Sequence, residues 1–165
     1  MGSLQGDIET SLSVLRRLTD TDFAALAWTS SNEQTIRWRF VSGNRNERYK
    51  KIVMFPGKGI GGKVFRSGRP MVIQSFSPKS GDDPREYPIL LAEGLHSAIA
   101  VPVTIDDQIM GVLLVGCRMN RVFPHETLEL VLDVAEQLGA VMQKRMENDK
   151  ADPASTILTR ANEIY

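Results

Sequence analysis

Residues 55–68 read FPGKGIGGKVFRSG, a glycine-rich turn that leads directly into a short helical pattern. Glycine allows a tight backbone turn, and the first N–H groups of a helix have no partners within the helix. Because these groups lie at the positive end of the helix dipole, the segment predicts a place where an anion can bind. The residues expected around this place are apolar: Trp38, Met54, Phe55 and Ile60. They indicate a small, dry pocket that favours a weakly hydrated anion over phosphate or sulfate.

The same stretch matches two phosphate-binding patterns, and both matches fail on their context. Gly57 to Lys63 fits G-x-x-x-x-G-K, but Val64 stands where a P-loop needs serine or threonine to hold magnesium. The spacing of Gly57, Gly59 and Gly62 fits G-x-G-x-x-G, but neither a parallel βαβ unit nor an acidic residue at the required distance is evident. A purely structural role, in which the glycines only shape a corner, is the alternative to an anion site.

Upstream of the turn, an alternating pattern predicts a strand over residues 36–40. Ile36, Trp38 and Phe40 alternate with two arginines, so the three apolar side chains are expected on one face of the strand. Trp38 is therefore expected to point inward.

The remaining elements predict an α+β fold in which helices cover an antiparallel sheet. Apolar spacing predicts a helix over residues 8–18 and a long one from Pro124 to about Asn148. Strands are expected at 23–28, 52–55, 69–73, 97–104 and 108–117, one or two helical turns at 87–93, and a polar loop at 77–86. Short links between consecutive strands favour antiparallel pairing, with the two terminal helices together on one face and a ligand pocket on the other.

Composition limits the function classes. The 165 residues hold 20 Lys and Arg and 20 Asp and Glu, so the basic excess of a nucleic-acid binder is missing. The longest apolar run, residues 109–117, is far shorter than the ~20 residues that span a bilayer, and no secretory signal pattern opens the chain. A cytoplasmic protein without a nucleic-acid or membrane partner is expected, with one domain over residues 1–148 and a polar tail at 149–165.

Other reactive side chains do not suggest catalysis or a metal site. A single cysteine cannot form an internal disulfide. One cysteine and two histidines are also too few for a typical zinc site. Cys117 ends an apolar strand and is predicted to be a small core residue, and His96 and His125 are predicted to lie at the surface or to cap elements. No Ser–His–Asp arrangement or pair of catalytic carboxylates is found, so enzymatic activity is not expected.

The glycine-rich turn and the predicted hairpin make the chain resemble a GAF domain over roughly residues 5–148. The residues that carry the resemblance are 57–65, 67–70, 97–103, 108–113 and Phe123. The resemblance implies a six-stranded antiparallel sheet sandwiched between helices, and a role in binding a small molecule or in dimerisation.

Among GAF domains, the pocket residues are similar to those of the nitrate receptors of a bacterial nitrate/oxygen-sensing system. This resemblance implies that two successive backbone amides, those of Ile60 and Gly61, hold nitrate at the start of the short helix. Gly61 departs from the pattern and is expected to enlarge the site while leaving the N–H in place. The other residues implied are Trp38, Met54, Tyr87, Pro88 and Ile89, the last through its own amide.

The same resemblance implies a binding switch without a cofactor. A receptor of this kind regulates a partner sensor histidine kinase in a two-component system for nitrate respiration, and a homodimer is a further expectation. Nitrate is expected to order the segment 77–94, which is rich in Pro, Gly and Asp, and so to change the surface that the partner meets.

Three alternatives stay open. Free methionine-(R)-sulfoxide reductases are also single GAF domains of this size, but they depend on several cysteines, whereas this chain has only Cys117. A cyclic-nucleotide-binding GAF module needs a larger pocket. A dimerisation module without a ligand would use the apolar stripes of the two terminal helices.

Overall fold

The computed structural model describes residues 3–29, 35–76 and 84–151, which fold around one six-stranded sheet. All strand pairs are antiparallel, and the strand order is β3-β2-β1-β6-β5-β4. The strands are β1 Phe23–Thr29, β2 Ile36–Ser42, β3 Val53–Met54, β4 Met71–Ile73, β5 Ser97–Ile105 and β6 Gln108–Cys117. The predicted α+β fold is therefore confirmed.

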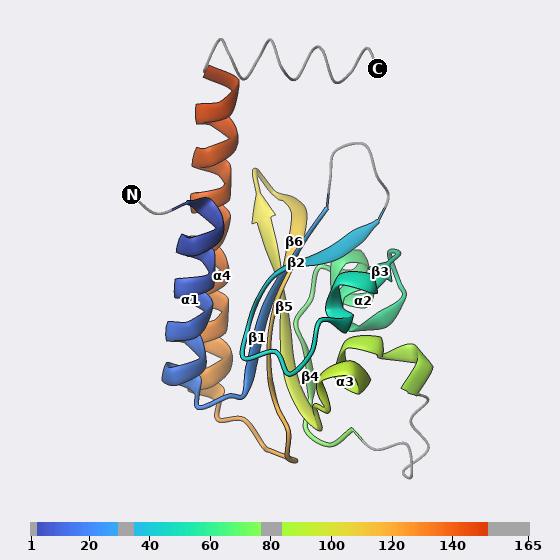
Figure 1. Ribbon diagram of the computed structural model, residues 1–165. Coiled ribbons are helices and arrows are strands. Elements are labelled where there is room, and N and C mark those ends of the chain that lie inside the picture. Colours follow the sequence, from blue (N-terminus) through green and yellow to red (C-terminus); the bar gives the residue numbers. More distant parts are fainter. Residues whose placement is uncertain (1–2, 30–34, 77–83, 152–165) are drawn as a thin grey trace.

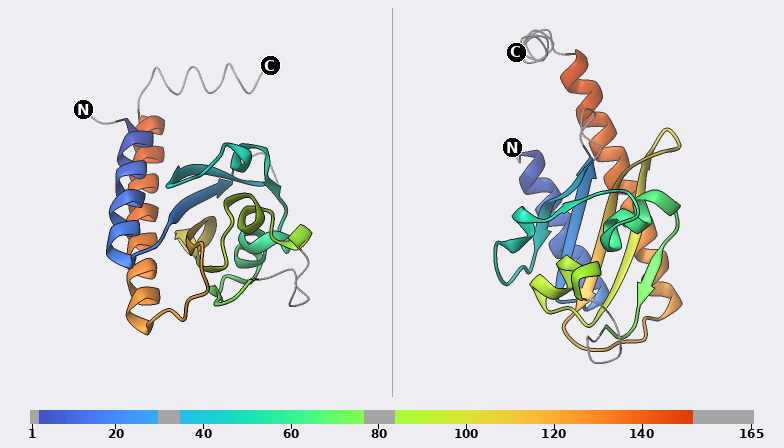
Figure 2. Two further views of the ribbon diagram at one scale, coloured as in Figure 1. Left: turned by 60° about the horizontal axis from the view of Figure 1, so that its bottom comes forward. Right: turned by 90° about the vertical axis from the view of Figure 1, so that its right-hand side faces the viewer.

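Helices cover both faces of this sheet, as Figure 1 shows. The α-helices are α1 Leu4–Thr19, α2 Gly59–Ser67, α3 Pro88–Glu93 and α4 His125–Ala151, and two short 3₁₀ helices are η1 Arg48–Lys51 and η3 Pro84–Glu86. The terminal helices α1 and α4 run side by side on one face, while α2 and α3 lie on the other (Figure 2). This is the predicted arrangement of the terminal helices.

The two faces bury separate hydrophobic clusters because β-strand side chains alternate between faces. The cluster under α1 and α4 includes Leu12, Leu26, Leu113 and Leu138. The cluster under α2 and α3, which surrounds the glycine-rich turn, contains Trp38, Met54, Ile60, Ile89 and Leu114, among others. Four of the seven predicted pocket residues, Trp38, Met54, Ile60 and Ile89, therefore belong to one core.

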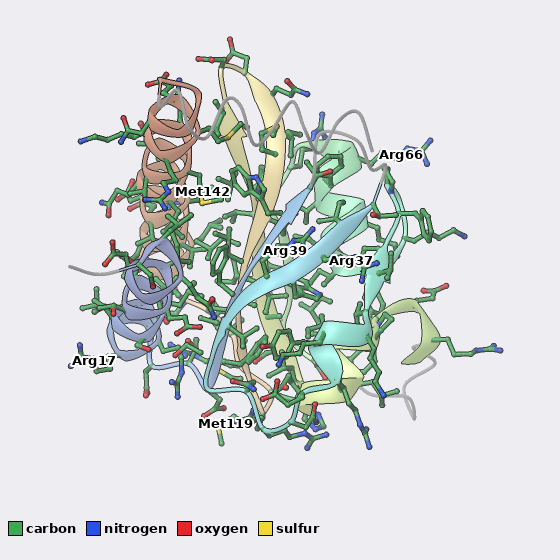
Figure 3. The ribbon with its side chains drawn as sticks, turned by 45° about the horizontal axis from the view of Figure 1, so that its top comes forward. Arg17, Arg37, Arg39, Arg66, Met119 and Met142 are labelled. Atoms are coloured by element: carbon green, nitrogen blue, oxygen red, sulfur yellow. The ribbon has the colours of Figure 1, made fainter. Side chains whose placement is uncertain are left out.

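A β-bulge in β2 corrects one expectation about the alternating strand. Ala27 pairs with Trp38 but Leu26 pairs with Phe40, so Arg39 is an extra residue on β2. The bulge reverses the alternation after Trp38, because two residues now oppose one on the partner strand. Trp38 faces α2 as expected, whereas Phe40 packs against the cluster under α1 and α4. Figure 3 marks Arg37 and Arg39 along this strand.

Several element boundaries differ from those predicted. The strands β3 and β4 are shorter than expected, since each lies at an edge of the sheet and has one neighbouring strand. Helix α4 begins at His125, directly after Pro124, whose carbonyl accepts the N–H of Thr127 at 3.0 Å. It continues to Ala151, into the start of the predicted tail. The rest of that tail and residues 77–83 of the predicted loop lie outside the described residues.

Candidate functional site

The glycine-rich turn folds back onto the first turn of α2. The N–H of Gly57 donates to the carbonyl of Gly62 at 2.8 Å, and the N–H of Lys58 donates to the carbonyl of Phe55 at 2.9 Å. A Cβ at Gly62 would lie 2.2 Å from the Phe55 carbonyl oxygen, so only glycine permits this close approach. Gly57, with φ of 86°, also requires the left-handed conformation that glycine adopts without strain. The sequence thus places the start of α2 rigidly beside β3.

The N-terminus of α2 lacks a side-chain cap from its N-cap residue. Lys58 is the N-cap residue, and its side chain makes no capping hydrogen bond. The N–H groups of Gly59, Ile60 and Gly61 belong to the first helical turn, where no carbonyl of the same helix can accept them. Ile60 and Gly61 are both buried. The positive end of the helix dipole and these donors therefore lie beside the buried cluster under α2 and α3.

Trp38 supplies a further donor at the same place. Its side chain is 3% exposed, and its indole N–H has no hydrogen-bond partner among the described residues. A Cβ at Gly61 would lie 3.4 Å from Cζ2 of Trp38, which is on the indole edge that carries the N–H. A buried donor without a partner costs about 1–3 kcal/mol, so an acceptor that binds here would recover that cost.

Met54 fills the space over Gly61. A Cβ at Gly61 would lie 2.6 Å from Sδ and 2.9 Å from Cε of Met54, which is itself buried. In this structure the thioether occupies the volume that a side chain at position 61 would take, so the space that the glycine leaves is filled by Met54. The glycine allows Met54 and Trp38 to approach the start of the helix closely.

The N-terminus of α3 forms the outer side of the site. Tyr87 is the N-cap residue, Pro88 is at the first helical position, and Ile89 is buried. Lys63 on α2 donates to the Tyr87 hydroxyl at 3.1 Å, and its ammonium lies 4.7 Å from the centre of the tyrosine ring. Phe76 makes an edge-to-face contact with the same ring, with the centroids 5.7 Å apart. These contacts hold the start of α3 against α2.

A cleft of about 560 Å³ lies outside these buried groups, over the start of α2. Met54 and Pro88 form part of its wall, so Met54 stands between the cleft and Gly61. The residues that line the cleft are Val53, Met54, Gly57, Lys58, Gly59, Lys63, Arg85, Glu86 and Pro88. Three of these side chains are cationic and one is anionic, so the entrance attracts anions. Sequence patterns alone did not indicate this basic entrance, because Lys63 and Arg85 are brought together only by the packing of α3 on α2.

The structure thus brings all seven predicted site residues to the same face of the sheet. Trp38, Met54, Ile60 and Ile89 belong to one buried cluster, Gly61 contacts it, and Tyr87 packs against it. Pro88 is the exposed member and faces the cleft.

The remaining reactive residues lie away from this site. Cys117 is buried, and its thiol contacts the backbone carbonyl of Asp20 at 3.8 Å. His125 is exposed and pairs with Glu129 at 3.0 Å. Among residues 3–29, 35–76 and 84–151, no group of three or more His, Cys, Asp or Glu side chains is placed to hold a metal ion. None of the helices in these ranges combines the length and apolar character needed to cross a bilayer.

Comparison with known proteins identifies the fold family and some relatives. The GAF domain family model matches residues 3–142. One similar solved structure is that of NreA from Staphylococcus aureus, mutated in its nitrate binding site. It is 39% identical to this chain, the match covers 72% of this chain and 88% of that one, and the TM-score is 0.64.

A curated relative and a more distant structure extend the comparison. The HTH-type transcriptional activator RamA of Corynebacterium glutamicum is 32% identical over 107 residues, which are 65% of this chain and 37% of the relative. This chain therefore matches only about a third of that protein's length. The free methionine-R-sulfoxide reductase of Neisseria meningitidis, in complex with its substrate, is 18% identical with a TM-score of 0.66, covering 84% of this chain and 77% of that one. At that identity the likeness concerns the fold alone.

Proposed function

This chain belongs to the GAF domain family, and from that premise we propose that it is a nitrate receptor. Nitrate binds at the N-terminus of α2, where the amides of Ile60 and Gly61 donate to its oxygens. Trp38 donates its indole N–H, Ile89 adds an amide from α3, and the remaining contacts come from Met54, Tyr87 and Pro88. A regulatory ligand-binding role agrees with the general role of the family.

One observation carries this proposal. The indole N–H of Trp38 is buried and finds no acceptor in the described part of the chain, at the place where the uncapped end of α2 presents its own donors. A small acceptor with several oxygens satisfies both sets of donors at once. A monovalent anion costs much less to transfer into this apolar surrounding than a dianion, which favours nitrate over sulfate or phosphate. The 39% identity to a structure named for a nitrate binding site supports the same ligand.

The first test is a nitrate titration followed by thermal melting and calorimetry. A ligand at about a hundred times its Kd adds about 2.7 kcal/mol to the free energy of unfolding, which a melt detects. We expect stabilisation by nitrate and none by equimolar sulfate, phosphate or cyclic nucleotides. A shift produced by sulfate as strongly as by nitrate would contradict an anion site selected by a dry pocket.

Trp38→Phe tests the donor directly because it keeps an aromatic ring and deletes the N–H. Hydrogen bonds to charged groups contribute about 1.5–3 kcal/mol, so the Kd for nitrate is expected to rise at least about tenfold. Trp28→Phe is the matched control, since Trp28 is half-buried on the opposite face of the sheet. Equal affinities of the two variants for nitrate would remove Trp38 from the site.

The downstream step is proposed to be control of a sensor histidine kinase in a two-component system of nitrate respiration, in the cytoplasm. The partial match to a transcriptional activator keeps a second candidate open, in which the domain senses another small effector for a different output. Reconstitution with a purified sensor kinase separates the two, because nitrate must change the rate of kinase autophosphorylation when this protein is present. A kinase that responds to nitrate equally without this protein would contradict the proposed role.

A further inference from the structure

A second hollow lies on the outer side of α3, where η1 approaches it. Its volume is about 250 Å³, and its lining is formed by Arg48, Ile52, Arg85, Pro88, Leu91 and Ala92. We refer to these six residues as the α3 groove. It is separate from the cleft over α2, although Arg85 and Pro88 take part in both.

The α3 groove combines an apolar floor with a cationic rim. Ile52, Pro88, Leu91 and Ala92 provide the floor, and Leu91 is 52% exposed, although leucine gains free energy from burial. Both charged residues of the lining, Arg48 and Arg85, are arginines.

The basic character extends beyond the rim on the η1 side. Arg45 lies next to the C-terminal end of α3, where its guanidinium donates to the carbonyls of Ala92 at 2.9 Å and Leu91 at 3.3 Å. The neighbouring acidic residue Glu47 is already paired with Lys50 at 2.9 Å. Arg45 and Arg48 therefore place positive charge along the η1 side of the groove, although the whole chain carries no formal net charge.

The wall formed by α3 is firmly anchored. Glu93, at the end of α3, is fully buried and accepts from Arg118 at 2.8 Å and from the backbone N–H of Arg45 at 2.8 Å. Asn46 donates to the Ala92 carbonyl at 2.8 Å. A wall fixed at several points keeps its shape before a partner arrives, which lowers the entropy lost on binding.

We propose that the α3 groove is the docking site for an acidic, amphipathic segment of a partner protein. Leucine-like side chains of the segment occupy the floor beside Leu91, and its carboxylates pair with Arg48 on the rim. Arginine suits such a rim because its planar guanidinium binds carboxylates in a bidentate manner. A concave hollow of this size accepts side chains from a folded or folding segment, whereas a flat anionic bilayer would leave the floor unfilled.

The groove also lies where a signalling partner could detect the ligand, and this part rests on the proposed function. Pro88 faces the cleft over α2 and also lines the α3 groove. A shift of the start of α3 on nitrate binding would therefore reach the docking surface directly. The chemistry of the groove itself does not depend on nitrate.

The test uses the full chain and a synthetic peptide, without nitrate. The peptide carries leucines four residues apart on one helical face and Asp or Glu at the flanking positions, with a fluorophore at its end for anisotropy. We expect saturable binding whose Kd rises at least about tenfold in Arg48→Glu and in Leu91→Asp. Binding to the parent chain should also weaken as the salt concentration rises. Both side chains are exposed, so both variants are expected to fold as the parent does.

Matched controls lie outside the groove: Arg39→Glu on β2 and Leu132→Asp on α4 should bind the peptide as the parent chain does. A peptide with Lys in place of Asp and Glu should not bind.

Equal affinity of the groove and control variants, or no saturable binding of the acidic peptide, would overturn the proposal. So would binding of phosphatidylserine vesicles that is lost in the same groove variants, because it would assign the surface to lipid. A nitrate-induced melting shift without peptide binding would leave the receptor proposal standing and remove only the docking site.

Discussion

At the scale of single residues, Met54 lies between the outer cleft and the candidate site. Its thioether contacts Gly61 and separates the outer cleft from the indole of Trp38. A ligand that reaches the buried donors must displace this side chain, and methionine is suited to that because it is unbranched and adapts its shape easily. We therefore expect Met54 to affect both ligand entry and size selection.

Met54→Ala is predicted to broaden anion selectivity. Loss of the thioether leaves a cavity beside Gly61, so larger monovalent anions such as perchlorate should gain affinity relative to nitrate by at least about tenfold. The fold should lose about 2–5 kcal/mol, as for other buried large-to-small changes. Competition calorimetry with nitrate and perchlorate measures the ratio.

Met142→Ala is the control for this substitution. Met142 is buried on α4, on the opposite side of the sheet (Figure 3), so its truncation costs stability without touching the candidate site. A change of anion selectivity in this variant equal to that in Met54→Ala would mean that selectivity follows stability rather than pocket shape.

At the scale of elements, sequence patterns predicted the strands and helices well but missed the bulge in β2. Trp38 was placed correctly, because the residues from Ile36 to Trp38 follow strict alternation. Phe40 was placed on the wrong face because one extra residue, Arg39, reverses the phase. Period-two patterns carry no sign of a bulge when the extra residue is itself charged and exposed. Long-range packing, such as that of Lys63 on Tyr87, is likewise absent from local patterns.

Deletion of Arg39 tests the bulge. Without this residue, Trp38 and Phe40 become neighbours and still face opposite sides, so the ladder with β1 becomes regular and the core is unchanged. We expect a folded protein whose free energy of unfolding changes by about 1 kcal/mol or less, measured by urea denaturation. Deletion of Arg37 is the contrasting variant, because it turns Ile36, the one β2 residue before it, away from the core and should cost about 2–5 kcal/mol of unfolding free energy. Equal damage by both deletions would contradict this account of the bulge.

Arg118 anchors the C-terminal end of α3 to the rest of the domain. Arg118 donates through Nε to the carbonyl of Glu93 at 2.9 Å and through its terminal nitrogen to the Glu93 carboxylate and the Gly43 carbonyl. Arg118→Met keeps the aliphatic stem but leaves the buried carboxylate without its cation, which should cost about 3 kcal/mol of unfolding free energy. Lys50→Ala breaks an exposed ion pair and should leave the urea midpoint unchanged. A loss no larger in Arg118→Met than in Lys50→Ala would show that α3 is held by packing alone.

At the scale of the whole molecule, the sheet separates two functions. One face buries the core under α1 and α4, and the other buries the candidate anion site under α2 and α3. Under the proposed function, we therefore expect ligand exchange and movement of Met54 to leave the terminal helices packed. The family assignment and this two-sided core agree with a domain that couples a small ligand to a surface change.

Hydrogen exchange with and without nitrate tests this separation. At short labelling times only local openings are seen, and binding should slow exchange in residues 58–62 and 87–91, whose backbone forms the site. Amides of α1 and α4 that exchange through local fraying should be unaffected, because no contact of the site reaches them. Amides that exchange only by global unfolding should all slow by the same factor, since nitrate stabilises the native state as a whole. Protection at short times that is equally strong in α1 and α4 would place the ligand's effect on the terminal helices instead.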